Sequence, residues 1–136
     1  MKNQKLLLQK MSGVSLMLLL FLFFSNCAGG GGTFSTDVWN ITYDDQEGGI
    51  SLTYKSKNIC NGMYASYQWE GKEIKTSDYA RHKISTGKVS DSFGKGHIYK
   101  VEYTDKELPE LTQYFYLYPD KEYILTDFTV EAKEEI

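Results

Sequence analysis

The sequence predicts an all-β domain, an antiparallel β-sandwich, behind an N-terminal signal-peptide helix. Three observations predict this fold class. The 136-residue chain contains 11 Tyr, 7 Phe and 2 Trp, and aromatic residues favour the pleated, half-buried surfaces of sheets. Apolar and polar residues alternate over short segments that Gly, Asn, Asp and Pro separate. After the leader, no window of 11 or more residues has a convincing helical period.

About seven short segments are expected to be strands, as is typical of a β-sandwich. The alternation places Trp39, Ile41 and Tyr43 on one strand face. In the same way it groups Tyr99, Val101 and Tyr103. The expected strands are 34–43, 50–57, 63–69, 97–104, 111–118 and 123–130, with an extended, loop-interrupted stretch at 73–85 and turns at 46–49, 61–62, 70–72, 105–110 and 119–121. A short charged ending follows the last strand, so the sandwich is expected to be incomplete or truncated.

Residues 1–26 have the parts of a secretory signal peptide. Three lysines form a positive n-region, and residues 14–24 form an apolar h-region of 11 residues. That length is shorter than the roughly 20 residues that cross a bilayer. The alternative is a membrane anchor over 6–24, which polar residues at 9–13 interrupt. The expected organisation is a leader at 1–26, a Gly-rich tether at 27–33 and a β-domain at 34–136.

The segment Phe24-Ser25-Asn26-Cys27 resembles the lipobox of bacterial lipoproteins. The resemblance implies cleavage before Cys27 and a diacylglycerol on its thiol, which would anchor the domain to a bacterial membrane. Phe24 and Asn26 depart from the usual Leu and small residue, as in lipoproteins of Bacteroidetes-type bacteria. Because no acidic residue directly follows Cys27, we expect the periplasmic side of the outer membrane rather than the cell surface. The alternative is an ordinary signal peptide cut near Cys27.

The only other cysteine is Cys60. If Cys27 is acylated, Cys60 has no partner within the chain, and if Cys27 is free, a Cys27–Cys60 disulfide is possible. The favoured interpretation of Cys60 is a small buried hydrophobe. Neither cysteine has metal-ligand spacing, and His82 and His97 are isolated. The sequence therefore predicts no metal site and no cofactor.

The charge of the exported part is acidic. From Cys27 onward it has 12 basic and 18 acidic residues, a net charge of −6. A protein that binds a phosphate backbone needs a basic surface. Nucleic acid is therefore excluded as an expected partner, and the membrane is expected to be reached through the lipid anchor.

The run Asp91-Ser92-Phe93-Gly94-Lys95-Gly96 is predicted to be a tight turn whose glycines supply positive φ angles. A phosphate-binding loop would need a following helix, whereas a strand is expected at 97–104. The segment 90–132 resembles the N-terminal β-sandwich of glycoside hydrolase family 36, which contains α-galactosidases and raffinose-synthase-like proteins. The matching positions are Asp91, Gly94, Gly96, 114–118 and 127–132.

This resemblance implies an accessory module that packs on a catalytic (β/α)₈ barrel and assists glycan processing. The catalytic aspartates of the family lie in that barrel, beyond Ile136, so no residue here is expected to be a nucleophile or general acid. The alternative is a free-standing periplasmic or surface lipoprotein that binds glycan or protein. An unaided glycosidase ranks last, because two carboxylates must flank one glycosidic bond.

Aromatic residues are the candidate contacts. Tyr114, Tyr116 and Tyr118 are expected on one strand face, with Phe115 and Leu117 in the core on the other. An exposed tyrosine row can stack on sugar rings or contact an adjoining domain. The alternative is that both faces are buried between sheets. Trp69 is a further candidate contact, although a core position is the more common role for it.

Overall fold

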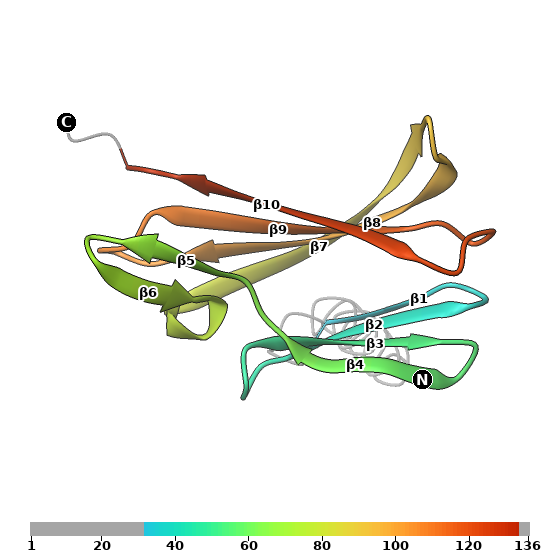
Figure 1. Cartoon of the computed structure of the whole chain (residues 1–136), viewed down its shortest axis with the longest axis horizontal. Coiled ribbons are helices and arrows are strands. Elements are labelled where there is room, and N and C mark those ends of the chain that lie inside the picture. Colours follow the sequence, from blue (N-terminus) through green and yellow to red (C-terminus); the bar gives the residue numbers. More distant parts are fainter. Residues whose placement is uncertain (1–31, 134–136) are drawn as a thin grey trace, which may run out of the picture. The chain divides into compact units, whose positions relative to one another are not determined.

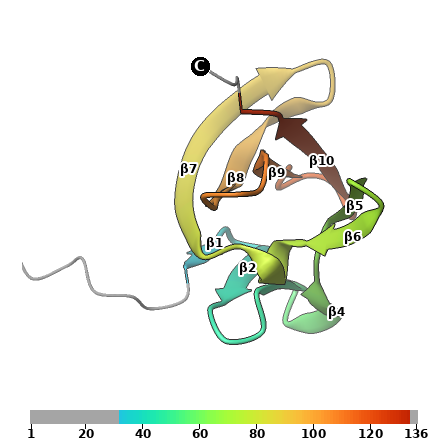
Figure 2. The ribbon, with the colours of Figure 1, turned by 90° about the vertical axis from the view of Figure 1, so that its left-hand side faces the viewer.

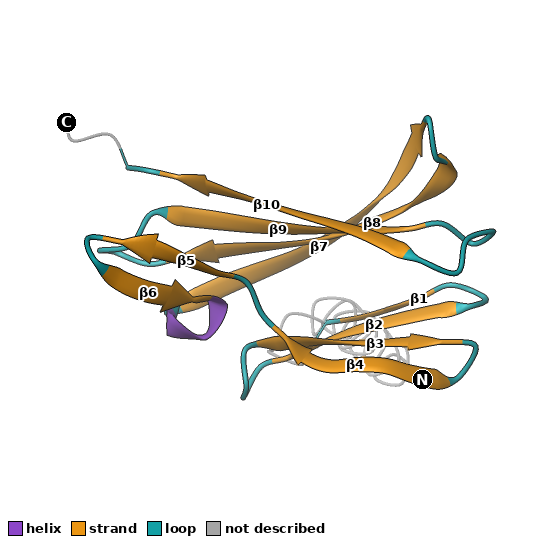
Figure 3. Cartoon of the chain, viewed as in Figure 1, coloured by secondary structure: helices purple, strands orange, loops and turns teal. Residues whose placement is uncertain are grey.

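The structure is a computed structural model of the chain and describes residues 32–133. These residues form ten β-strands and one 3-10 turn (Figure 3), which confirms the predicted all-β class. The predicted signal peptide, Cys27 and most of the predicted tether lie outside the described residues. Within residues 32–133, no helix is long and apolar enough to cross a membrane.

Two four-stranded antiparallel sheets form the two main layers (Figure 1). The first sheet has the order β1-β2-β3-β4, the second has the order β10-β9-β8-β7, and β5 pairs with β6 in a separate hairpin (Figure 2). The strands are β1 Thr33–Ser35, β2 Trp39–Asp44, β3 Gly49–Tyr54, β4 Lys57–Met63, β5 Ser66–Trp69, β6 Lys72–Lys75, β7 Arg81–Asp91, β8 Gly94–Thr104, β9 Glu110–Leu117 and β10 Ile124–Glu131. The 3-10 turn Thr76–Asp78 connects β6 to β7.

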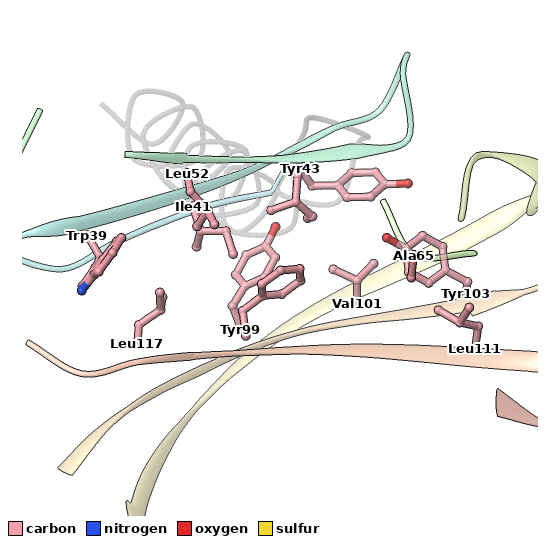
Figure 4. Close-up of a cluster of buried hydrophobic side chains, with 12 residues drawn as sticks. Trp39, Ile41, Tyr43, Leu52, Ala65, Tyr99, Val101, Tyr103, Leu111 and Leu117 are labelled. Atoms are coloured by element: carbon pink, nitrogen blue, oxygen red, sulfur yellow. The ribbon is translucent and has the colours of Figure 1, made fainter. Parts of the chain in front are cut away.

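The hydrophobic core lies between the two facing layers (Figure 4). Strands β2, β8 and β9 follow the predicted alternation, because their inward side chains are buried and their neighbours are less so. Burial of an aromatic side chain removes a large apolar area from water and stabilises the fold. The buried cluster contains Trp39, Ile41, Tyr43, Ile50, Leu52, Ala65, Tyr99, Val101, Tyr103, Leu111, Phe115 and Leu117.

The expected first strand is divided in the structure. Residues 36–38 form a reversal, so β1 folds back and pairs antiparallel with β2. The Thr36 hydroxyl accepts a hydrogen bond from the Trp39 N–H at 2.9 Å, and the Thr36 N–H donates to the Trp39 carbonyl at 2.7 Å. A threonine side chain that bonds its own backbone in this way stabilises a turn instead of an extended strand.

The hairpin expected at Asn61-Gly62 is also displaced. The chain reverses at Lys55-Ser56, whose φ angles are 45° and 63°, as a two-residue hairpin loop requires. Gly62 lies within β4 with a φ of 65°, beside irregularities in the β3–β4 register. A Cβ on Gly49 would lie 2.8 Å from the Gly62 Cα. The two glycines therefore allow a close approach of strands rather than a turn.

Candidate binding face

The second sheet turns one face away from the core, and we call this face the outer face. Tyr114 and Tyr116 of β9 lie on it, because Phe115 and Leu117 between and after them are buried in the core. Both tyrosines are half-buried. Their ring centroids are 6.4 Å apart, and the ring planes differ by 22°. The outer face therefore presents two neighbouring rings that are almost parallel.

Strand register places an apolar side chain on each side of Tyr116. Tyr116 lies opposite Ile98 of β8 and Leu125 of β10, which are both half-buried. Cross-strand neighbours on one face of a sheet contact each other. We call Ile98, Tyr114, Tyr116 and Leu125 the tyrosine platform.

The other cross-strand neighbours of the tyrosine platform are charged. Tyr114 lies opposite Lys100 of β8 and Asp127 of β10. The ammonium of Lys100 forms a 3.1 Å ion pair with Glu102. Burial raises the pKa of Tyr116, and the negative charge of Asp127 raises it further. Its phenol is therefore neutral at physiological pH and can both donate and accept a hydrogen bond.

Tyr118 departs from the expectation that it shares the face of Tyr114 and Tyr116 in a tyrosine row. Strand β9 ends at Leu117, and Tyr118 is 0% exposed. Its hydroxyl donates a 2.6 Å hydrogen bond to Asp91 Oδ2 at the end of β7. Its ring lies 6.2 Å from that of Phe93 in the β7–β8 turn. Tyr118 therefore stabilises the end of the sheet, and its buried ring is not accessible to a ligand.

The hydrogen bond between Tyr118 and Asp91 shifts the pKa values of both side chains. The Tyr118 donor stabilises the carboxylate and lowers the pKa of Asp91. Burial, together with the bond to Asp91, raises the pKa of Tyr118 to about 12. The pair is thus a carboxylate with a neutral phenol over the whole physiological range.

The predicted turn motif is a structural unit around this pair. Asp91 Oδ1 accepts a hydrogen bond from the Phe93 N–H at 2.9 Å, and Gly94 has the left-handed φ of 125° that favours glycine. A Cβ on Gly96 would lie 2.6 Å from the Leu117 carbonyl oxygen and 2.8 Å from Tyr118 Cδ1. Gly96 therefore makes room for the aromatic ring, and the motif closes the β7–β8 hairpin.

The remaining candidate residues lie elsewhere. Trp69 is half-buried on the β5–β6 hairpin, opposite Lys72 and in a different sheet from the tyrosine platform. Cys60 of β4 packs against the core, as expected of a small hydrophobe, but it is half-buried and not buried. Cys27 lies outside the described residues, so the structure does not bear on its predicted acylation.

The surface hollows of the domain are shallow and open. One of about 500 Å³ lies beside the β7–β8 hairpin and is lined by Lys88, Val89, Ser90, Lys95, Gly96, His97 and Pro119. In residues 32–133, no three side chains of His, Cys, Asp or Glu are grouped as metal ligands. The tyrosine platform is therefore the best candidate for a binding surface, because it can bind a partner by ring stacking and apolar contact.

Comparison with known proteins adds no relative. No family model, no curated protein and no solved structure that was searched matches the chain.

Sequence reasoning missed two members of the platform, Ile98 and Leu125. Each belongs to a predicted strand, but only the register with β9 places it beside Tyr116. A strand sequence shows which residues share its own face and does not show which residues of another strand lie opposite.

Proposed function

We propose that the chain is a non-catalytic accessory β-sandwich module of an exported carbohydrate-active lipoprotein. It assists glycan processing by packing on a catalytic barrel of the α-galactosidase-like type. The observation that carries this proposal is the tyrosine platform, in which Tyr116 lies between Ile98 and Leu125 on the outer face and the Tyr114 ring stacks beside it. Surfaces that combine tyrosines with aliphatic side chains are typical of contacts between protein domains.

The chemistry of the platform fits such a contact better than a catalytic cleft. The Tyr116 phenol is neutral, and Lys100 beside Tyr114 is already paired with Glu102. Burial of Ile98, Tyr116 and Leu125 against a barrel would remove apolar area from water. Asp127 and the Lys100–Glu102 pair would add a desolvation cost wherever the barrel covers them. In this proposal the Gly-rich sequence at 28–32 links the module to the lipid on Cys27.

The first test examines the DNA downstream of the codon for Ile136. An in-frame or frameshifted barrel of the family-36 type supports the accessory module. That barrel is then mixed with the full chain, and association is measured by sedimentation velocity. We expect Tyr116→Ser to weaken association at least tenfold. Tyr64→Ser is the matched control, because Tyr64 is 52% exposed and lies outside the platform. An unrelated downstream gene, or equal association of both variants, overturns the proposal.

The second candidate function is a free-standing lipoprotein that binds glycan on the same platform. The 22° angle between the Tyr114 and Tyr116 rings favours it, because nearly parallel ring faces can stack on successive sugar rings. An open platform has few converging polar groups, so we expect millimolar affinity, about −4 kcal/mol. Calorimetric titration with raffinose and melibiose tests this function. Binding that Tyr116→Ala leaves unchanged contradicts the platform as the glycan site.

A further inference from the structure

The outer edges of the two main sheets differ in how they are protected. Edge strands expose rows of backbone N–H and C=O groups, and natural proteins protect them by short length, bulges, lysines or prolines. The edges of the first sheet are β1 and β4, and those of the second are β10 and β7.

Three of these edges have protection of a known kind. Strand β1 has only three residues. Strand β4 has register shifts against β3 and a left-handed Gly62. Strand β7 has four basic residues, Arg81, Lys83 and Lys88 together with His82. None of the three edges offers a long, regular and weakly charged row of backbone groups.

Strand β10 has none of these protections. It pairs with β9 through eight consecutive residues without a register shift, and its sequence ILTDFTVE contains no Pro, Gly, Lys or Arg. The middle of the strand, residues 126–129, is exposed. Phe128 is 45% exposed, although its alternation places it on the same face as the core residues of β9. Among the described residues, no strand pairs with the outer edge of β10.

The backbone of Phe128 faces this open edge. Its N–H donates a 2.8 Å hydrogen bond to the carboxylate of Asp127. In an antiparallel strand, alternate residues direct both backbone groups to the same side. Ile124, Thr126 and Val130 therefore share the orientation of Phe128, and the edge offers four residues to a further strand.

We infer that β10 pairs antiparallel with β10 of a second copy of this chain, across a two-fold axis. Such an interface uses the same patch on both copies, and β10 is compatible with itself. An axis at Phe128 places the two Phe128 side chains together, Asp127 opposite Thr129, and Leu125 opposite Glu131. An axis at Asp127 would set two carboxylates face to face, which is unfavourable. The dimer is therefore a continuous sheet with its axis at Phe128.

This pairing overlaps the tyrosine platform only at Leu125, which lies opposite Glu131 of the second copy. The platform lies on the outer face of the sheet, whereas the proposed contact uses the edge and the inward side of Phe128. In the dimer the N–H of Phe128 exchanges the Asp127 carboxylate for a carbonyl of the second copy. The carboxylate is then free to accept a hydrogen bond from the Thr129 hydroxyl opposite.

Sedimentation equilibrium of the full chain in density-matched detergent tests the dimer. We expect a reversible dimer for the wild type and at least tenfold weaker association for Phe128→Lys, because a lysine at an edge opposes strand addition. Ile59→Lys is the matched control, since Ile59 is an exposed apolar residue of the irregular edge β4, 56% exposed. Circular dichroism must show that both variants are folded. A monomeric wild type, or equal association of both variants, overturns the inference.

A second measurement reads the register directly. In a Cys60→Ser background, oxidation of Phe128→Cys is expected to give a disulfide-linked dimer, because directly opposed strand residues lie within disulfide range. Thr129→Cys is the control, since Thr129 lies opposite Asp127 and not opposite itself. Equal cross-linking of the two variants contradicts an axis at Phe128.

Discussion

Tyr118, the first residue after β9, donates a 2.6 Å hydrogen bond to Asp91, the last residue of β7. The two residues are 27 positions apart in the chain, and β8 lies between their strands in the sheet. Their bond passes over Gly96, where a side chain would collide with the Tyr118 ring. Three strands are thereby joined at one end of the second sheet.

Acid should remove the contribution of this bond. The Tyr118 hydrogen bond lowers the folded pKa of Asp91 below its ordinary value of 3.8. The bond therefore stabilises the fold above that pH, and the stabilisation is lost as the pH falls through the lower folded pKa. We expect Asp91→Asn to lower the Tm at about pH 6 and to have a smaller effect near about pH 2. Thermal denaturation at both pH values measures the difference in Tm between the wild type and Asp91→Asn. An equal difference at the two pH values would contradict the hydrogen bond between Tyr118 and the Asp91 carboxylate.

Gly96→Ala should destabilise the domain by steric collision. The new Cβ would lie 2.6 Å from the Leu117 carbonyl oxygen, and overpacking of this kind costs about 1–3 kcal/mol. Gly87→Ala is the control, because Gly87 is in β7 of the same sheet and a Cβ there meets nothing within 4 Å. Urea denaturation should show the loss for Gly96→Ala and no loss for Gly87→Ala. Equal stability of the two variants would show that Gly96 is not needed for close approach.

Neighbouring residues of β9 should differ sharply in their effect on stability. Phe115 is 0% exposed in the core, so Phe115→Ala should cost about 3–5 kcal/mol. Tyr114 lies on the outer face, and Tyr114→Ala should cost less than about 1 kcal/mol. If Phe115→Ala does not fold, Phe115→Leu provides a milder comparison. Denaturation midpoints that rank the two sites in the opposite order would contradict the assigned faces.

The inward faces of β2, β8 and β9 were predictable because apolar residues occupy most of their alternate positions, although Gln113 of β9 is a buried polar exception. Strand β7 was not, because its inward positions include His82 and Lys88 as well as Ile84, and an edge strand needs no continuous apolar face. Of the candidate site, Tyr114 and Tyr116 follow from the period of two. The different environment of Tyr118 depends on where β9 ends and on the contact with Asp91, and neither follows from alternation.

Acylation of Cys27 remains a prediction from the leader sequence. The order of a basic segment, an apolar segment and a cysteine followed by glycines predicts it. Metabolic labelling with a clickable fatty acid should mark the wild type and Cys60→Ser. It should not mark Cys27→Ser. Label that persists in Cys27→Ser would exclude Cys27 as the lipid site.

The chain by itself is not expected to hydrolyse α-galactosides. The resemblance to the glycosidase family carries no catalytic aspartate into this sequence, and glycoside hydrolysis needs two carboxylates flanking one bond. Incubation with an aryl α-galactoside should release no aryl alcohol above the uncatalysed rate. Turnover that survives repurification would contradict the accessory-module proposal.

The loop after β9 also ties the two layers together. The Trp39 indole N–H donates to the Lys121 carbonyl at 3.3 Å across 82 positions of sequence, and the Tyr54 hydroxyl donates to Glu122 at 3.4 Å. Contacts of such separation form late and slow folding. The packing of the N-terminal sheet against the second sheet is therefore completed only after the loop that contains Lys121 and Glu122 has been synthesised.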